Sequence, residues 1–281
     1  MKIQPTTNHL RMLASARGNL WAMQEDHLRA EALASLDAIE KHEAGVEMSD
    51  LFPMKKEAAL VDMAGAVVAV IPVAGSLVNK CPKLYEDLGL ATRYGTIIEE
   101  TDRAVAAGAA GIIYTVDSPG GTVAGVAEAG AAIANAGIPT VAYCEGLTCS
   151  AAYWLASQCQ SVVAAPSAEV GNIGAILSWA DCSAFWQEMG VEFKALVSEG
   201  AELKSTFHLE PDETQLEFLQ ERINEAGEAF RTSVQTGRTL AGATLDDEVW
   251  RAGWYSGKRA EALGLVDEIG GLDDALAHFS A

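Results

Sequence analysis

Residues 1–60 and residues 61–281 differ in how apolar and polar positions alternate. Between residues 24 and 44 the apolar side chains recur at helical spacing among many charged ones, and a polar segment containing Gly45 and Pro53 follows. This pattern is typical of an amphipathic helix appended to a domain. We therefore predict an N-terminal helical arm over residues 1–60 and one domain over residues 61–281.

Beyond residue 60, short apolar runs rich in β-branched residues alternate with helical patterns. The runs that predict strands cover residues 64–72, 111–116, 139–146, 161–165, 191–197 and 265–270. The helical patterns cover residues 96–107, 123–136, 150–159, 183–189, 211–238 and 258–264. Apolar strands separated by helices are typical of parallel βαβ crossovers that bury both faces of a sheet. The sequence therefore predicts the α/β class.

Charge and composition narrow the classes of partner. The 281 residues are 49% hydrophobic, and 19 Lys and Arg against 39 Asp and Glu leave a net charge of −20. A field of this sign repels phosphate backbones and anionic lipid heads, so neither nucleic acid nor a membrane is an expected partner. The start of the chain lacks the apolar core of a signal peptide, and the uncharged stretch 146–168 is interrupted by polar residues and Pro166, as in a buried protein core.

The cysteines and histidines show no metal-ligand pattern. Five of each are scattered along the chain without a CxxC spacing. We therefore expect buried free thiols in a reducing compartment, no metal and no cofactor.

Two junctions between a predicted strand and the next helix could carry chemistry, because ligands gather where the parallel strands of α/β sheets end. Residues 117–121, DSPGG, follow one strand, and their proline and glycines permit a turn with free backbone N–H groups. Ser150 begins a helix after the next strand, among small residues. Each junction also has a simpler interpretation, namely a tight βα turn for the first and a helix N-cap for Ser150.

Together these motifs resemble a known family. The segments VIPVAGSLV, DSPGGTVAG, TCSAAYWLAS, VGNIGAI and SGKRAEALGLVDEIGG occur in the order found in serine peptidases of the signal peptide peptidase A family. The greater likeness is to the head-maturation (prohead, or capsid assembly) proteases of tailed phages within that family, and it spans residues 64–271. The resemblance implies the Clp protease/crotonase-like superfold of stacked ββα units.

The resemblance also implies a role for four residues. Ser150 matches the nucleophile, and the backbone N–H groups of Gly121 and Ala151 match the oxyanion hole. The general base of the family is a lysine, in a Ser-Lys dyad, and Lys204 lies at the matching place. Three residues separate Gly200 from Lys204 where the family has two, and alanines replace the glycines that usually follow the nucleophile.

The chemistry of the dyad requires a neutral amine, so the pKa of the lysine must fall from about 10.4 toward 7 or 8. Lys194 and His208 are the other candidate bases. Cys149, beside Ser150, is a further candidate nucleophile, although a buried structural thiol is the simpler interpretation.

The function implied by the resemblance is a serine endopeptidase that cleaves scaffold, portal or capsid polypeptides inside an assembling prohead in host cytoplasm. Members of the family form rings in which neighbouring subunits help to build the active site, so a homo-oligomer is expected. Alternatives from the sequence are a bacterial or prophage signal-peptide or protein-quality peptidase, an inactive assembly scaffold, and a crotonase acting on acyl-CoA.

Overall fold

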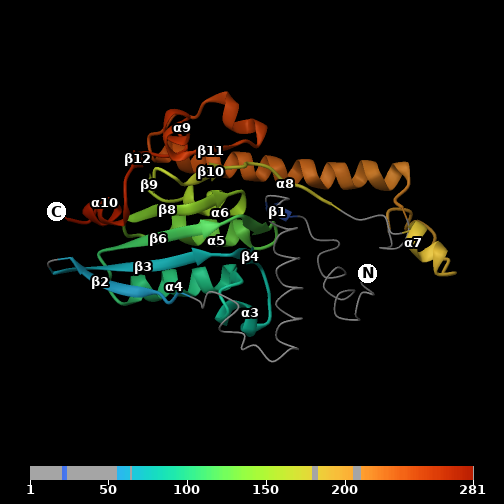
Figure 1. Cartoon of the computed structure of the whole chain (residues 1–281), viewed down its shortest axis with the longest axis horizontal. Coiled ribbons are helices and arrows are strands. Elements are labelled where there is room, and N and C mark those ends of the chain that lie inside the picture. Colours follow the sequence, from blue (N-terminus) through green and yellow to red (C-terminus); the bar gives the residue numbers. More distant parts are fainter. Residues whose placement is uncertain (1–20, 24–55, 64, 179–182, 205–209, 281) are drawn as a thin grey trace, which may run out of the picture.

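The computed structural model describes residues 21–23, 56–63, 65–178, 183–204 and 210–280 (Figure 1). Its elements form a mixed α/β fold with two sheets and surrounding helices, which confirms the predicted class. The helix expected between residues 24 and 44 lies outside the described residues. None of the helices in the described part of the chain is long and apolar enough to cross a membrane.

The large sheet has the strand order β11-β10-β8-β6-β3-β2, and β9 pairs with both β8 and β12. Its strands are β2 (Ala59–Met63), β3 (Ala66–Ala74), β6 (Gly111–Ser118), β8 (Thr140–Cys149), β9 (Ser161–Ala164), β10 (Glu169–Gly171), β11 (Trp254–Ser256) and β12 (Glu268–Ile269). The central strands β3, β6 and β8 are parallel. Their carboxyl ends therefore lie at one edge of the sheet, where both candidate junctions follow.

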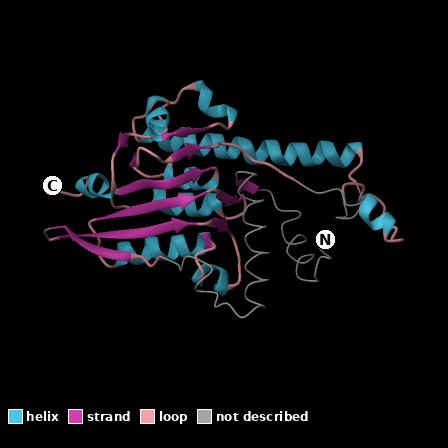
Figure 2. Cartoon of the chain, viewed as in Figure 1, coloured by secondary structure: helices cyan, strands magenta, loops and turns pink. Residues whose placement is uncertain are grey.

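Both faces of the large sheet are covered at its centre, which explains why the central strands β3 and β6 are mostly apolar. On β6, Ile112 and Tyr114 point into the main core, whereas Ile113 points into a smaller core on the opposite face. Helices α4 (Tyr94–Ala106), α5 (Val126–Ala134) and α6 (Ala151–Ala156) contribute to the main core, and α10 (Leu272–Ala277) contributes to the smaller one. Figure 2 shows the helices arranged around the strands of the sheet.

A small second sheet has the order β1-β7-β4-β5. It consists of β1 (Trp21–Met23), β7 (Gly120–Thr122), β4 (Ser76–Val78) and β5 (Ala91–Arg93), and the short helix α3 (Lys83–Asp87) precedes β5. Strands β4 and β7 follow β3 and β6 almost directly. The chain thus passes from the large sheet into the small one at the edge where the parallel strands end.

The longest helix, α8 (Glu213–Leu240), packs its last turns against the core and extends beyond the sheet at its other end, where α7 (Ser183–Glu188) is drawn (Figure 1). Asp212 and Gln215 form a capping box at its start. Near its end, Phe230 stacks on Trp154 of α6 with ring centroids 4.8 Å apart. Gly237 lies so close to the carbonyl oxygen of Ser157 that a Cβ atom would approach it to 2.2 Å.

The C-terminal segment is fastened to α8 by a buried ion pair. The side chain of Arg238 is fully buried and binds Asp267 through both terminal nitrogens, at 3.0 and 2.6 Å. Asp267 also accepts the backbone N–H of Val162. The same segment includes the 3-10 helix η2 (Asp247–Arg251) and α9 (Gly257–Ala262), which the sequence predicts over residues 258–264.

The strand predicted over residues 191–197 is wrong. These residues form no strand, and Leu196 is fully exposed while Val191 and Val197 are 41% and 47% exposed. A strand needs a partner edge for its backbone groups, and none of the described strands pairs with this segment. The apolar pattern that suggested a buried strand instead marks an exposed apolar segment.

Candidate active site

Ser150 forms a sharp turn between the end of β8 and the start of α6. Its backbone angles are φ 57° and ψ −123°, a conformation that residues other than glycine rarely adopt. Strain of this kind costs on the order of 1–3 kcal/mol and is concentrated at functional sites. The Ser150 hydroxyl makes no N-cap hydrogen bond to α6. The structure thus disfavours the interpretation of Ser150 as a helix cap and matches the strained strand-to-helix turn of serine nucleophiles.

The VGNIGAI segment holds this turn in place. The backbone N–H of Ser150 donates to the carbonyl of Gly171 at 2.8 Å, and the N–H of Asn172 donates to the carbonyl of Gly253 at 2.7 Å. Gly171 has φ 125°, and a Cβ atom there would lie 2.7 Å from the Gly253 carbonyl oxygen. Only glycine fits this position without displacing the segment that supports Ser150.

The DSPGG turn is held by its own side chains. Ser118 donates its hydroxyl proton to the carbonyl of Gly75 at 2.6 Å, and the same hydroxyl accepts the N–H of Gly120 at 3.1 Å. A Cβ atom on Gly121 would lie 1.7 Å from the carbonyl oxygen of Leu77, so β7 and β4 can approach this closely only with glycine at position 121. The turn therefore presents the Gly121 backbone from a fixed position.

The two junctions lie on neighbouring strands. Ser118 of β6 is paired with Thr148 of β8, two residues before Ser150. The register shifts between Val116 and Ser118, and at this irregularity the Asp117 carboxylate accepts the N–H of Leu147 at 3.0 Å. The structure thus brings Ser150, Ala151 and the DSPGG turn, which contains Gly121, to one edge of the large sheet.

The Ser150 side chain is 1% exposed, and its Oγ atom has no hydrogen-bond partner among the described residues. A buried hydroxyl normally has a partner, and an exception calls for an explanation such as a catalytic role. The neighbouring Cys149 is also buried, and burial raises the pKa of its thiol to about 12. A thiol of this pKa is almost entirely protonated near neutrality, so the structure disfavours Cys149 as the nucleophile.

The structure does not bring Lys204 to Ser150 within one chain. Lys204 is exposed, in a turn whose Glu202 carbonyl accepts the side-chain amide of Gln215 in the first turn of α8. Gln215 lies 15 residues before Phe230, which stacks against the Ser150 helix, and this separation corresponds to roughly 22 Å along α8. Of the other candidate bases, Lys194 is exposed and paired with Glu192, and His208 lies outside the described residues.

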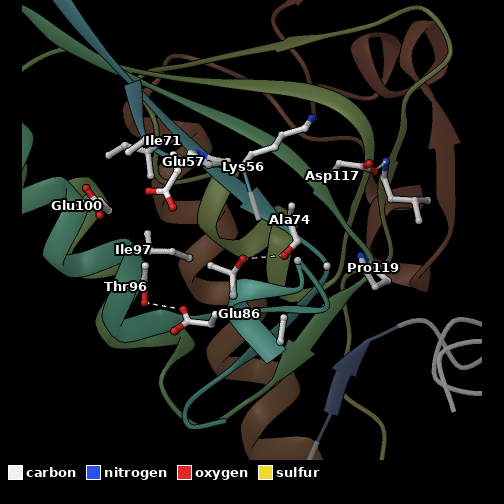
Figure 3. Close-up of a pocket in the computed structure, with 17 residues that line it drawn as sticks. Lys56, Glu57, Ile71, Ala74, Glu86, Thr96, Ile97, Glu100, Asp117 and Pro119 are labelled. Carbon is white, nitrogen blue, oxygen red and sulfur yellow. Dashed lines mark hydrogen bonds between the residues drawn. The ribbon is translucent and has the colours of Figure 1, made fainter. Parts of the chain in front are cut away.

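A cavity of about 320 Å³ lies beside the DSPGG turn, at the carboxyl ends of the parallel strands (Figure 3). Ile71, Ala74 and Ile97 supply apolar walls, whereas Glu100 and Asp117 supply carboxylates.

The wall formed by α3 and α4 contains a buried carboxylate. The Glu86 side chain is 3% exposed, accepts the Thr96 hydroxyl at 2.7 Å and forms an ion pair with Arg93. Burial raises the pKa of Glu86, but the hydrogen bonds from Thr96 and Arg93 outweigh it, so the pKa lies below its ordinary value. Glu86 is therefore a charged and firmly held part of this wall.

Comparison with known proteins identifies the family. The sequence profile of peptidase family S49 matches residues 132–281, more than half of the chain. The chain belongs to peptidase family S49. The matched region includes the Ser150 turn, the VGNIGAI segment and all of α8.

Two similar relatives are phage proteins. The capsid assembly protease C of Escherichia phage lambda is 32% identical over 216 residues, which cover 74% of this chain and 48% of the relative. The head-tail preconnector protein GP5 of Enterobacteria phage P21 is 27% identical, with coverages of 75% and 42%. The chain thus spans about half the length of the curated relatives it matches.

Cellular relatives are also similar. A putative signal peptide peptidase SppA of Enterococcus faecium is 29% identical, with coverages of 59% and 49%. Among solved structures, a membrane-bound stomatin-specific protease bound to a substrate peptide has 15% identity and a TM-score of 0.47, with coverages of 76% and 80%.

Sequence reasoning missed the residues that hold the site in shape. Asp117 and Ser118 belong to a recognised motif, but their hydrogen bonds to Leu147 and Gly75 cross between strands and have no local signal. The small sheet was also missed, because β7 consists of Gly-Gly-Thr, which lacks the apolar or β-branched residues typical of strands.

Proposed function

We propose that this S49 chain is a serine peptidase in which Ser150 attacks the carbonyl carbon of a peptide bond. This proposal rests on Ser150, whose backbone is strained and whose buried Oγ atom neither caps α6 nor makes any other hydrogen bond among the described residues. The N–H groups of Gly121 and Ala151 are the proposed donors to the oxyanion of the tetrahedral intermediate. Such donors each contribute about 3–4 kcal/mol to transition-state stabilisation.

The proposed reaction proceeds through an acyl-enzyme. A neutral lysine amine takes the Ser150 proton as the Oγ–carbon bond forms, and the resulting ammonium protonates the leaving amine as the peptide bond breaks. Water, deprotonated by the same amine, then releases the acid product and restores the hydroxyl. This chemistry requires an amine within hydrogen-bonding distance of Ser150 Oγ, which no described residue of the same chain provides.

We propose that Lys204 of a neighbouring copy supplies this amine. Lys204 is exposed and separated from its own Ser150 by much of the length of α8. Half of the exposed large hydrophobic side chains among the described residues belong to the same part of the chain, residues 189–218, namely Met189, Val191, Leu196, Val197, Leu203, Leu216 and Phe218. Apolar surface of this extent is typical of protein–protein contacts. Burial against a second copy would also provide the desolvation that lowers the pKa of a lysine.

The proposed substrates are scaffold, portal or capsid polypeptides, cleaved inside an assembling prohead. The lambda and P21 relatives, whose names refer to capsid assembly and to the head-tail preconnector, support this choice. The alternative, a signal-peptide or protein-quality peptidase, is supported by the SppA relative. The cavity beside DSPGG is a candidate for binding a substrate side chain, and its carboxylates favour an apolar or basic side chain over an acidic one.

Mixing experiments with Ser150→Ala and Lys204→Ala test the proposed dyad. Each variant alone is expected to be inactive toward casein. If the dyad forms between copies, a co-expressed 1:1 mixture regains up to about one quarter of wild-type activity, because each site needs an intact serine copy beside an intact lysine copy. Lys194→Ala is the matched control and stays active. Activity of Ser150→Ala alone would overturn the nucleophile assignment, and a mixture as inactive as its components would overturn the pairing between copies.

The substrate class needs a separate test. The chain is co-expressed with scaffold, portal and capsid proteins, and fragment masses are compared between wild type and Ser150→Ala. Fragments that appear only with the wild type support head maturation. Cleavage of casein by the wild type without cleavage of any head protein would favour the alternative.

A further inference from the structure

Strand β1 from the N-terminal region lies directly along the proposed oxyanion strand. Trp21, Ala22 and Met23 pair antiparallel with Thr122, Gly121 and Gly120, respectively, so Ala22 lies opposite Gly121. In Figure 3, β1 is the blue strand below Pro119. A segment about a hundred residues away in sequence thus occupies the edge beside the proposed active site.

This edge of β7 is the place where a substrate backbone would lie. The other edge of β7 is paired with β4, where Leu77 lies opposite Gly121. A substrate whose carbonyl accepts a hydrogen bond from Gly121 must therefore approach from the edge that β1 occupies. Extended peptides commonly bind by adding a strand to an exposed sheet edge, where the main chain supplies the affinity.

The composition of β7 suits an added peptide of varied sequence. Gly120 and Gly121 carry no side chains, so the residues opposite them meet no cross-strand side chain at these two positions. The backbone of this edge is also fixed, because Ser118 binds the Gly120 N–H and Gly121 packs against Leu77. Strand β1 has only three residues, and so short a strand is held weakly enough to be displaced.

We propose that β1 is a bound peptide in the substrate position, so that the chain's own residues 21–23 compete with polypeptide substrates for the edge of β7. This proposal rests on the proposed function, since it takes Gly121 as part of the catalytic centre. The ligand class of the edge is an extended peptide antiparallel to β7. Because β1 is covalently attached, it competes at an effective concentration that does not depend on the protein concentration, and free peptides must compete against it.

A binding experiment tests the proposal without requiring catalysis. The probe is a fluorescein-labelled peptide with the sequence of residues 17–28, RGNLWAMQEDHL. Its affinity is measured by anisotropy for Ser150→Ala and for the same protein carrying Trp21→Pro and Ala22→Pro. Consecutive N–H groups of a strand point to opposite edges, so one of the two groups at positions 21 and 22 faces β7. Two adjacent prolines therefore always remove one N–H that could bond to β7. Trp21→Ala, which keeps both N–H groups, is the control for loss of the Trp21 side chain.

We expect the proline variant to bind the probe about tenfold or more tightly than Ser150→Ala. The Trp21→Ala control stays close to Ser150→Ala, and a probe with prolines at the same two positions binds neither protein. Equal affinities for the proline variant and Ser150→Ala would overturn the proposal, as would equal binding of the proline-containing probe. An unchanged melting temperature checks that the proline variant is folded.

A kinetic experiment separates this proposal from the proposed function. With Ser150 intact, the proline pair is expected to lower the KM for casein several-fold at unchanged kcat, because a competing ligand has been removed. If neither the wild type nor the proline variant cleaves casein, the peptidase assignment fails. The binding experiment still tests whether β1 competes with peptides for the edge of β7. If casein is cleaved with the same KM by both, the peptidase assignment stands and the competition by β1 is overturned.

Discussion

The backbone N–H of Ser150 is hydrogen bonded to the carbonyl of Gly171, 21 positions further along the chain, at 2.8 Å. This bond joins the end of β8 to β10 and fixes the residue with the most unusual backbone of the candidate site. Because Gly171 has a positive φ and no room for a Cβ beside the Gly253 carbonyl, the support of the strained Ser150 backbone requires glycine at position 171. The geometry of the proposed nucleophile therefore depends on a residue that does not take part in the reaction.

Gly171→Ala is expected to lower kcat for casein. The rise in activation free energy is expected to exceed the loss in the free energy of unfolding. The added methyl group would lie 2.7 Å from the Gly253 carbonyl, so β10 must shift and carry the Ser150 turn with it. Gly227→Ala, on α8 with open space around it, is the matched control and should be neutral or stabilising by about 1 kcal/mol. Steady-state kinetics and thermal unfolding of both variants check this, and an unchanged kcat for Gly171→Ala would contradict it.

Gly121→Ala tests the proposed oxyanion hole. A Cβ atom cannot coexist with the Leu77 carbonyl, so β7 must move and withdraw the Gly121 N–H. Loss of one such donor typically lowers kcat by about 10²–10³-fold. Gly95→Ala in α4, where the methyl group meets nothing within 4 Å, should retain wild-type kcat. A Gly121→Ala enzyme with wild-type turnover would exclude this donor.

Alkylation distinguishes Ser150 from the adjacent thiol. Since burial raises the pKa of Cys149 to about 12, iodoacetamide near neutral pH should leave activity unchanged, and Cys149→Ala should remain active. A serine-directed phosphonate should inactivate the wild type and modify Ser150, as read by peptide mass spectrometry. Inactivation by iodoacetamide that disappears in Cys149→Ala would instead identify the cysteine as the nucleophile.

Glu86 should contribute to the loss of the free energy of unfolding at acidic pH. Its folded pKa lies below the ordinary value of 4.5, so the ionised carboxylate stabilises the fold above about pH 4.5, and this contribution is lost as the pH falls through the folded pKa. In Glu86→Gln the free energy of unfolding should therefore fall less steeply with decreasing pH. Urea unfolding between neutral pH and about pH 3 measures the slope. Glu225→Gln, which removes an exposed ion pair with Arg222, is the matched charge-to-neutral control.

Removal of Arg238 should destabilise the chain by about 3–5 kcal/mol, because it leaves Asp267 without its buried partner. The comparison is Arg259→Ala, which breaks an exposed pair with Glu248 and should cost about 1 kcal/mol or less. Denaturant unfolding measures both. Equal losses in the free energy of unfolding would show that the buried ion pair stabilises the fold no more than the exposed one.

Local patterns predicted the elements of the main core well. The strands at 111–116 and 161–165 and the helix starting near Pro211 were found because each has a clear apolar period or capping signal. The small sheet was missed because its strands have three residues each and are defined by long-range pairing. The strand expected at 191–197 failed because an apolar pattern does not reveal whether a partner edge exists.

The motifs of the candidate site could be recognised in the sequence, but their geometry could not, and the roles of their residues stay predictions. Motif order pointed to Ser150 and the DSPGG turn, and the structure places these at the ends of the neighbouring strands β8 and β6. Neither the positive φ of Ser150 nor the separation of Lys204 from Ser150 can be read from the sequence, because both follow from tertiary packing. The base assignment stays a prediction that the mixing experiment decides.

The exposed position of Lys204, shortly after the exposed apolar segment 191–197 in sequence, has a consequence for when proteolysis begins. If another copy supplies the base, as proposed, a dilute chain would leave other proteins uncleaved, since its serine would lack a proton acceptor. Proteolysis would begin only once copies accumulate in a confined volume. Local crowding would then act as the trigger, without a separate activating factor.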